Sequence, residues 1–431
     1  HGHSHGGGED GGHGHSHGGN VLGLNPATHI VLFTFVFIDV LGFSIILPLL
    51  PFLAERFDVG PTEIGWLVAS NAIAQVVAAP IIGKLSDRFG RRLALLTCVG
   101  ASCLGFLALS RAETFTTVIL CRVFDGLFGG NISLAQTYMT DVTSENTRTR
   151  GMGILGAALG LGFIFGPAVG AFLSPNYYLA AYIAAVLSFL NFTAVFMMLP
   201  ESLPRDKRDT SSSLFAIFPL GSIFRGLLDY RLRPVLLARF ILGVLLTTVE
   251  SYIGLFLEHE LGAAPRMAGL VLTLFATLYS LTQSPFILTR VAARLSEKSV
   301  MVLSFLILGV SLWLWSVATS MAFIMGAIAL FAFGAGFLNP LISSLISRLA
   351  GGQDKGGFLG LSASIGSLTR IVAPVLGGYA IDAKTTVDPD SPLYLFTGYR
   401  GPALAASIVA IVTAVYLQFA ARPMYGSSHS K

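Results

Sequence analysis

Six ionisable side chains interrupt the long apolar stretches of this 431-residue sequence. They are Asp39, Arg122, Asp125, Arg239, Glu250 and Arg370. A charge in an apolar environment is costly, so each of these residues is a candidate for binding a substrate or transferring a proton. Burial disfavours a charged carboxylate, whereas a nearby arginine favours it. A carboxylate whose distance from an arginine changes with conformation could therefore couple protonation to that change.

The positions of these residues in the sequence suggest different roles. Asp39 has no neighbouring cation in the sequence, which makes it the first candidate for protonation. Arg122 and Asp125 lie three residues apart, where the two charges could simply neutralise each other on one helix. Glu250 and Arg370 could form a structural ion pair between two helices, or they could bind substrate or take part in proton coupling.

The composition indicates a membrane protein with many spans. Hydrophobic residues make up 53% of the sequence and charged residues only 12%, about half of the roughly 25% that is usual in soluble domains. The mean hydropathy is +0.73. A net charge of +4 that is spread over loops excludes a nucleic-acid binder. We find no nucleotide loop, nucleophile elbow or catalytic metal triad, so we expect neither an enzyme nor a cofactor.

Twelve segments are long and apolar enough to span a membrane, which takes about 20 residues each. They are 29–52, 64–83, 93–110, 115–138, 151–173, 178–199, 235–257, 267–288, 299–317, 321–346, 358–381 and 403–420. Six of them precede a polar stretch and six follow it. Arg239 lies only four residues into the seventh segment, where a long side chain could reach the membrane interface. We therefore expect an all-α membrane protein of two pseudo-symmetric six-helix bundles.

The distribution of lysine and arginine predicts the orientation. If both termini are cytoplasmic, the cytoplasmic loops and the C-terminal tail contain 19 of the 27 basic residues, whereas the outer loops contain five. We therefore expect both termini on the cytoplasmic side.

The two halves of the chain repeat each other. Shifts of 204 and 207 residues superpose Leu53 on Leu257, Pro61 on Pro265, Gly65 on Gly269, Pro167 on Pro374 and Gly170 on Gly377. Two parallel repeats imply a binding site between them near the middle of the membrane, and they favour alternating access as the mechanism. The expected parts are a His/Gly-rich tail at 1–28, a first bundle at 29–199, a linker with an interfacial helix at 200–234, a second bundle at 235–420 and a tail at 421–431.

The loop after the second segment reads G-K-L-S-D-R-F-G-R-R over residues 83–92. Gly83 permits close approach of helices, Asp87 can accept hydrogen bonds, and Gly90 allows a tight turn. The arginines that favour the cytoplasmic face are Arg88, Arg91 and Arg92. This string resembles the signature loop of the major facilitator superfamily.

The fifth segment reads G-L-G-F-I-F-G-P-A-V-G-A over residues 160–171. Gly162, Gly166 and Gly170 lie four residues apart on one face, so a neighbouring helix can approach closely. Pro167 removes a backbone donor and bends the segment. The stretch resembles the antiporter motif of the superfamily's drug–proton exchangers, with alanine in place of the last glycine. General small-residue packing between helices would give the same pattern.

The first segment contains F-I-D-V-L-G-F-S-I-I-L-P-L-L-P over residues 37–51, which places Asp39 roughly 15 Å inside the cytoplasmic boundary. This resembles the first helix of tetracycline-resistance efflux proteins, whose aspartate there is functionally important. G-N-I-S-L at 130–134, V-E-S-Y at 249–252 and Arg370 look closer to the eukaryotic tetracycline-transporter-like relatives. Bacterial tetracycline exporters carry acidic residues in the third and ninth helices, and their absence from the third and ninth segments here argues against export of metal–tetracycline.

The resemblance covers essentially the whole chain. It implies a secondary active transporter of a small organic, amphipathic or drug-like solute, coupled to protons by antiport, in the lipid bilayer of the plasma membrane or an organelle. We expect a monomer. Arg122, in R-V-F-D-G, matches a membrane-embedded arginine that the superfamily links to proton coupling. The predicted proton-coupling residues are Asp39, Arg122, Asp125 and Glu250. The predicted substrate-binding residues are Asp39, Asn131, Gln136, Glu250, Asn339 and Arg370.

The N-terminal tail contains six of the nine histidines, in two H-G-H-S-H repeats. They are His1, His3, His5, His13, His15 and His17. Clustered imidazoles bind divalent transition metals. A divalent metal or metal-chelate transporter is therefore an alternative function, although the segments contain no cluster of His or Cys ligands, and a low-complexity tail without a role would look the same. A non-transporting receptor or scaffold on the same fold is a further alternative.

Overall fold

A computed structural model describes residues 26–208, 232–284, 287, 290, 294–349 and 355–420. The predicted histidine metal site, the interfacial helix of the linker and the C-terminal tail lie outside these residues. The described residues form helices and no strand. The helices of the first half are α1 Pro26–Ile46, η1 Leu47–Leu49, α2 Leu50–Glu55, α3 Pro61–Phe89, α4 Arg91–Leu109, α5 Phe115–Leu127, α6 Asn131–Val142, α7 Glu145–Leu173 and α8 Tyr177–Met198, and the short η2 Arg205–Lys207 follows them. Those of the second half are α10 Arg233–Leu261, α11 Arg266–Thr282, α13 Glu297–Ser316, α14 Met321–Leu349, α15 Lys355–Asp382, η3 Ala383–Thr385, η4 Pro392–Phe396 and α16 Gly401–Ala420.

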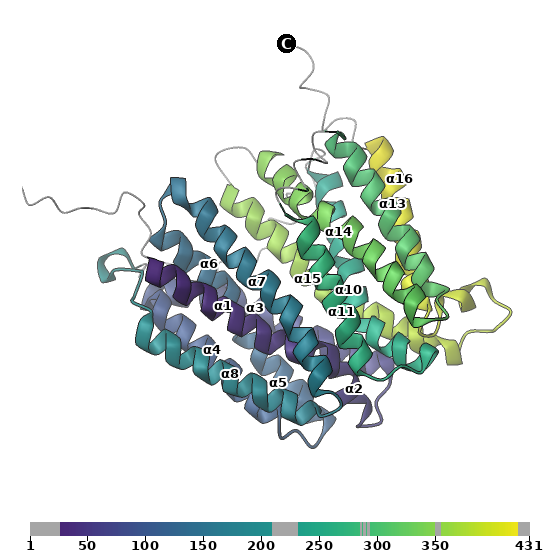
Figure 1. Ribbon diagram of the computed structural model, residues 1–431, viewed down its shortest axis with the longest axis horizontal. Coiled ribbons are helices and arrows are strands. Elements are labelled where there is room, and N and C mark those ends of the chain that lie inside the picture. The colour runs from purple at the N-terminus through teal and green to yellow at the C-terminus, as the bar shows by residue number, and fades with distance from the viewer. Residues whose placement is uncertain are drawn as a thin grey trace, which may run out of the picture.

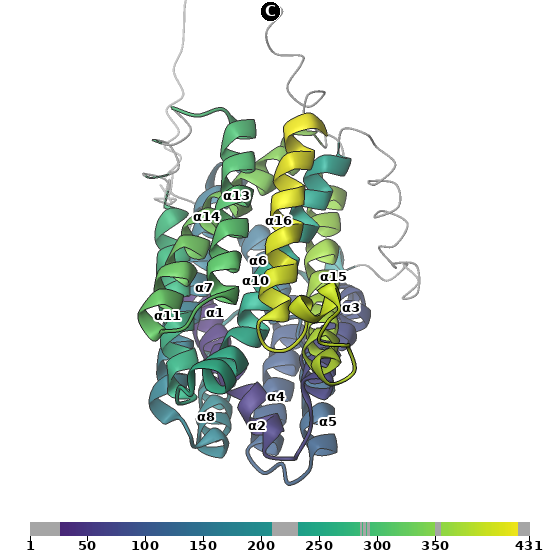
Figure 2. The same ribbon diagram turned by 90° about the vertical axis from the view of Figure 1, so that its right-hand side faces the viewer.

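The long helices stand side by side in two groups, with α1 to α8 on one side and α10 to α16 on the other (Figures 1 and 2). Ten helical segments of the described residues are long and apolar enough to cross a membrane, and α11 is a shorter apolar helix. The two halves meet mainly where α3 packs on α15 and where α7 packs on α11. The predicted all-α membrane architecture is confirmed at this level.

Each group has two ends, which we name by their loops. The linker end contains the turn at Gly90 and the loop at 200–208, and the far end contains the turns at Gly60 and Gly262. At the far end, Gly65 of α3 lies directly on the backbone carbonyl of Pro374 in α15, and Gly269 of α11 on that of Pro167 in α7. The sequence repeat relates these two contacts, so one glycine–carbonyl contact occurs twice and closes the far end.

Glycines nearer the linker end have no such contacts. A side-chain carbon added to Gly83 of α3, to Gly156 of α7 or to Gly366 of α15 would meet no atom of the described chain within 4 Å. The close approach that we predicted for Gly83 is therefore not made in this conformation. The halves are joined through small residues at the far end, whereas these three glycines towards the linker end make no such contact with the other half in the described chain.

Two of the predicted spans are broken helices. In the first segment, α1 gives way to η1 at Leu47, because Pro48 and Pro51 lack a backbone donor. In the fourth segment, α5 ends at Leu127 and α6 begins at Asn131, whereas the sequence predicted one continuous span. The intervening glycines, 129 and 130, disfavour a continuous helix, because glycine loses more conformational entropy in a helix than other residues do.

A backbone group that this break releases has a partner, because the amide of Gln75 donates to the carbonyl of Gly129 at 2.5 Å. The amide of Asn71 donates to the carbonyl of Arg122, within α5, at 3.0 Å. Irregular backbone at membrane depth is tolerated only where its polar groups are bonded again or line a cavity. The amide of Gln75 in α3 therefore stabilises the break in the helix.

Candidate functional site

Two cavities bring together six of the eight residues that were predicted for proton coupling or substrate binding. The first has a volume of about 40 Å³, and its walls include Arg122 of α5, Glu250 of α10 and Arg370 of α15. The second has a volume of about 80 Å³, and its walls include Asp39 of α1, Asp125 of α5 and again Arg370. The two cavities share Phe43, Asn71, Phe163 and Arg370 as lining residues. Five of the six ionisable residues inside the apolar segments thus converge on one region.

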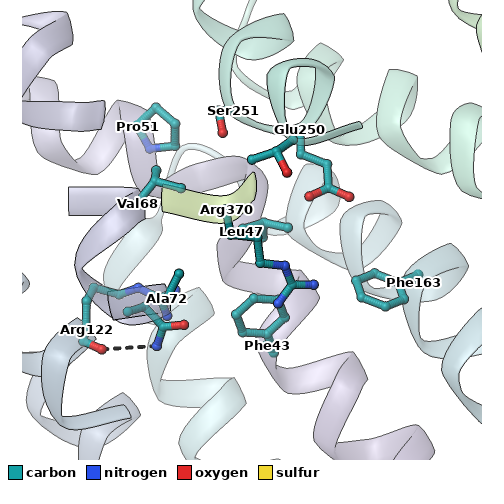
Figure 3. Close-up of a pocket in the computed structure, with 12 residues that line it drawn as sticks. Phe43, Leu47, Pro51, Val68, Ala72, Arg122, Phe163, Glu250, Ser251 and Arg370 are labelled. Carbon is teal, nitrogen blue, oxygen red and sulfur yellow. Dashed lines mark hydrogen bonds between the residues drawn. The ribbon is translucent and has the colours of Figure 1, made fainter. Parts of the chain in front are cut away.

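Glu250 and Arg370 face the first cavity from two helices of the second half. Figure 3 shows both side chains among Phe43, Leu47 and Phe163 of the first half. Glu250 is half-buried and Arg370 is exposed to the cavity. In the described part of the chain neither side chain makes a hydrogen bond or an ion pair within 4.0 Å. The static ion pair considered from the sequence is therefore not formed here.

Asp39 lies in the second cavity, two turns before α1 gives way to η1. Its Oδ1 accepts a hydrogen bond of 2.7 Å from the amide of Asn131. Asn131 is the first residue of α6 and is 5% exposed, so the break in the fourth segment is what directs this amide at Asp39. Asn131 itself has a second polar atom, Oδ1, that is buried without a hydrogen-bond partner among the described residues.

Arg122 and Asp125 form the local ion pair that their spacing predicts. Arg122 Nη1 lies 3.2 Å from Asp125 Oδ2, and the guanidinium also lies 5.6 Å from the ring centroid of Phe43. Asp125 further accepts hydrogen bonds from Asn71 at 3.1 Å and from Ser102 at 3.5 Å. Because Arg122 is only 4% exposed, this pair is desolvated, and its two charges neutralise each other, unlike those of Glu250 and Arg370. Arg122 Nε is buried without a hydrogen-bond partner among the described residues.

Two of the predicted substrate-binding residues, Gln136 and Asn339, line neither cavity. Gln136 is exposed. Asn339 of α14 accepts a hydrogen bond from Arg239 of α10, which we had placed at the membrane interface and which is half-buried between these helices. Asn71, one of the amide side chains that the sequence offers as polar lining, lines both cavities and contacts Asp125. An amide in the middle of an apolar segment was the signal for it.

The signature loop forms a network at the linker end. Gly90 has φ +109°, which only glycine adopts readily, and its turn brings the amide of Arg91 within 2.8 Å of Glu201. The Arg91 guanidinium lies 2.5 Å from Asp87 and 3.0 Å from Asp141. The loop thus fixes the ends of α3, α4 and α6 to the start of the linker. Arg88 lies over the ring of Phe89, and Arg92 donates to the carbonyl of Phe196.

The small-residue face of α7 packs against α1. A carbon added to Gly170 would lie 2.6 Å from the carbonyl oxygen of Ile45, and one added to Gly162 would lie 2.8 Å from Val40. Gly166 meets Ser44, whose hydroxyl donates to the carbonyl of Gly162 at 2.9 Å. This close packing fixes the helix that carries Asp39 on the helix that carries Phe163.

The whole chain matches one family. The sequence model of the Major Facilitator Superfamily matches residues 32–259 and again 235–429. The chain belongs to the major facilitator superfamily. This confirms the predicted resemblance. Membership makes the chain an integral, multi-pass protein of a transporter superfamily rather than an enzyme.

Individual superfamily members resemble the chain over most of its length. It is 30% identical over 363 residues to the tetracycline resistance protein, class B, of Escherichia coli, which covers 82% of this chain and 88% of that protein. It is 27% identical over 401 residues to major facilitator superfamily domain-containing protein 10 of Mus musculus, which covers 80% and 85%. The solved structure of the human organic anion transporter MFSD10 (TETRAN) aligns with a TM-score of 0.67 at 22% identity, covering 91% of this chain and 99% of that one. This structure supports the superfamily fold alone.

Proposed function

We propose that this chain exchanges a small organic, amphipathic solute for protons by alternating access. The observation that carries the proposal is the pair of unpartnered opposite charges, Glu250 and Arg370, at a cavity between the two halves. A permanently buried charge without a partner is costly. Water or a ligand that contacts the two charged groups lowers this cost. Their position therefore fits a site that binds a ligand and releases it to water.

The surroundings of these charges favour an amphipathic solute. The aromatic rings of Phe43 and Phe163 and the side chains of Leu47 and Val68 offer apolar contact, while Glu250 and Arg370 offer charge in the same cavity. Sites for such ligands are mostly apolar with a few polar groups that fix orientation. Cavities of about 40 and 80 Å³ hold only a few waters each, so binding requires the cavity to widen.

Asp39 is our candidate for the coupling proton. It has one neutral hydrogen-bond donor, Asn131, and no ion pair within 4.0 Å in the described chain. The other acidic residue of its cavity, Asp125, is already neutralised by Arg122. A carboxylate with a neutral partner in a confined, water-sized cavity can exist in both protonation states, whereas one fixed in an ion pair favours the charged state.

Alternating access is supported by the glycines. Gly65 and Gly269 make close contacts at the far end, whereas a carbon added to Gly83, Gly156 or Gly366, towards the linker end, would meet no atom of the described chain within 4 Å. Exchange of these two sets of contacts would open one end while closing the other. We further propose twelve spans with the linker end in the cytoplasm. The excess of basic residues in the loops of that end supports this orientation.

Replacing Asp39 tests the proton coupling. We expect Asp39→Asn to abolish pH-driven accumulation of a fluorescent organic ion in proteoliposomes while exchange at equal pH survives, because the amide cannot release a proton. The probe is the organic cation or anion that raises the apparent melting temperature of the purified protein most. Asp58→Asn, at an exposed far-end residue with φ +55° that asparagine tolerates, is the matched control. Normal pH-driven accumulation by Asp39→Asn would refute the assignment.

A double-mutant cycle tests the substrate site. If Glu250 and Arg370 bind the solute, Glu250→Gln and Arg370→Gln should each weaken probe binding, and the double variant should fold but remain inactive. If they act as a structural pair, the double variant should recover the transport that either single change removes. Glu113→Gln, at an exposed carboxylate of the far end, is the control for loss of one charge. Wild-type transport by both single variants would exclude both interpretations.

A further inference from the structure

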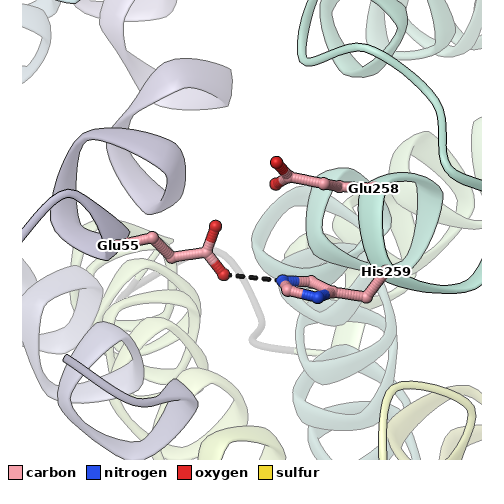
Figure 4. Close-up of side chains that lie close together, drawn as sticks. All are labelled: Glu55, Glu258 and His259. Atoms are coloured by element: carbon pink, nitrogen blue, oxygen red, sulfur yellow. Dashed lines mark hydrogen bonds and ion pairs between the residues drawn. The ribbon is translucent and has the colours of Figure 1, made fainter. Parts of the chain in front are cut away.

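A second cluster of ionisable side chains joins the two halves at the far end, away from both cavities. Glu55 ends α2 in the first half, and Glu258 and His259 lie near the end of α10 in the second half. Figure 4 shows them reaching towards one another across the interface. His259 Nε2 lies 2.8 Å from Glu55 Oε1, and one ligand atom from each of the three residues lies within 4.8 Å of the others.

These donors suit a transition-metal ion. Imidazole nitrogen and carboxylate oxygen bind Zn²⁺ at about 2.0–2.2 Å, which places tetrahedral ligands roughly 3.4 Å apart. The widest separation in the cluster therefore has to shrink by only about 1.4 Å, a change that rotation of two glutamate side chains provides. Three protein ligands would leave a fourth position for water.

One atom of the cluster lacks the partner that a purely structural ion pair would give it. Glu258 is half-buried and its carboxyl group faces that of Glu55, but no donor in the described part of the chain lies within hydrogen-bond distance of its buried Oε2. A buried carboxylate oxygen without a donor is costly, and a cation placed between Glu55 and Glu258 would remove that cost together with the repulsion of the two carboxylates. The neighbouring cation, Arg56, instead lies over the rings of Tyr177 and Tyr178.

The surroundings orient the imidazole and attract a cation. The His259 ring stacks on Tyr399, with ring centroids 4.3 Å apart and planes inclined by 4°. Stacking on Tyr399 thus holds the imidazole beside the carboxylates of Glu55 and Glu258.

We propose that Glu55, Glu258 and His259 form a binding site for a divalent transition-metal ion, with Zn²⁺ as the best match, that bridges the two halves. Because the ligands come from both halves, the site exists only while the far end is closed. A bound ion therefore favours the closed far end by its full difference in affinity between the two states. The site is separate from the histidine tail and from the two cavities.

The test uses the full-length chain with the six tail histidines replaced by alanine, so that the tail does not compete for the ion. We expect Zn²⁺ to raise the apparent melting temperature of this protein and to occupy one site in equilibrium dialysis. His259→Ala should weaken that binding at least about 100-fold, since loss of an outer-shell partner alone costs 10–100-fold. Glu258→Gln should also weaken it strongly, whereas Glu113→Gln should not. Equal Zn²⁺ affinity in all of these variants would overturn the site.

Spin labels on Arg111→Cys and Asp388→Cys, two exposed far-end positions in opposite halves, test the bridging. Zn²⁺ should increase the short-distance population measured by pulsed electron paramagnetic resonance, and His259→Ala should remove this effect. Zn²⁺ binding that depends on His259 but leaves the distances unchanged would overturn the bridging role. Neither measurement uses transport, so the proposed function and this site can fail separately.

Discussion

Gly269 of α11 offers the sharpest test of how the far end closes. The residue has no room for a side chain, because a carbon added to it would lie 2.5 Å from the carbonyl oxygen of Pro167 and 2.7 Å from the side chain of Ala171. The Pro167 oxygen belongs to the backbone and the Ala171 carbon is the only side-chain atom of that residue, so neither can rotate away. Gly269→Ala should therefore push α7 and α11 apart at the far end.

The size of the effect follows from the overlap. Inserting a methyl group into a packed contact typically costs about 1–3 kcal/mol when the neighbours must move. Because the contact exists only while the far end is closed, this cost lowers the ratio of closed to open molecules by about 5- to 150-fold. A protein that is closed in a ratio of 99 to 1 would change to about 95 to 5 at the lower limit, and to about 40 to 60 at the upper limit.

Distances between spin labels on Arg111→Cys and Asp388→Cys measure this ratio directly. Gly269→Ala should add a long-distance population, and Gly65→Ala, at the repeat-related contact with Pro374, should do the same. Gly156→Ala is the matched control, since it lies on α7 and has no atom of the described chain within 4 Å of the added carbon. A distribution for Gly269→Ala that matches the control would refute the idea that these glycines hold the far end closed.

Two further predictions concern the buried ion pair and the tail. Asp125→Asn should leave the guanidinium of Arg122 buried without its charge partner and should lower stability by about 3–5 kcal/mol. This loss would appear in the melting temperature, and Arg122→Gln in the same chain should recover most of it. Deleting residues 1–19 should leave organic-solute transport within about two-fold, or under about 1 kcal/mol on the barrier, and should remove most of the affinity for immobilised metal. Loss of organic-solute transport on deletion would instead favour the metal-transport alternative.

The positions of the helices could be predicted from the sequence because hydrocarbon imposes a simple requirement. Each span needs about 20 apolar residues, and little else in the chain satisfies that length. The local pair of Arg122 and Asp125 was equally predictable, since residues that are three apart in a helix lie on the same face. Asp39 could be identified as a candidate from the sequence alone, because it is an acidic residue in the middle of an apolar segment.

The breaks and the long-range partners could not be predicted in the same way. Hydropathy averages over a window, so two glycines at 129 and 130 do not interrupt an apolar segment even though they end a helix. The amide that reaches Asp39 depends on that break, because Asn131 becomes the first residue of a new helix. Whether Glu250 meets Arg370 depends on how far apart α10 and α15 stand, which no spacing in the sequence determines.

The repeat relates the helix contacts of the two halves but not their charges. The contacts that close the far end follow the repeat, since Gly65 on Pro374 and Gly269 on Pro167 are equivalent. The charges do not follow it: Asp39, Arg122 and Asp125 belong to the first half, and Glu250 and Arg370 to the second. Motion that respects the repeat therefore moves two unlike charge sets relative to each other. Under the proposed function, Asp39 of the first half exchanges the proton, and Glu250 and Arg370 of the second half meet the solute. Arg370 lines both cavities, so it is the residue that would link the two events.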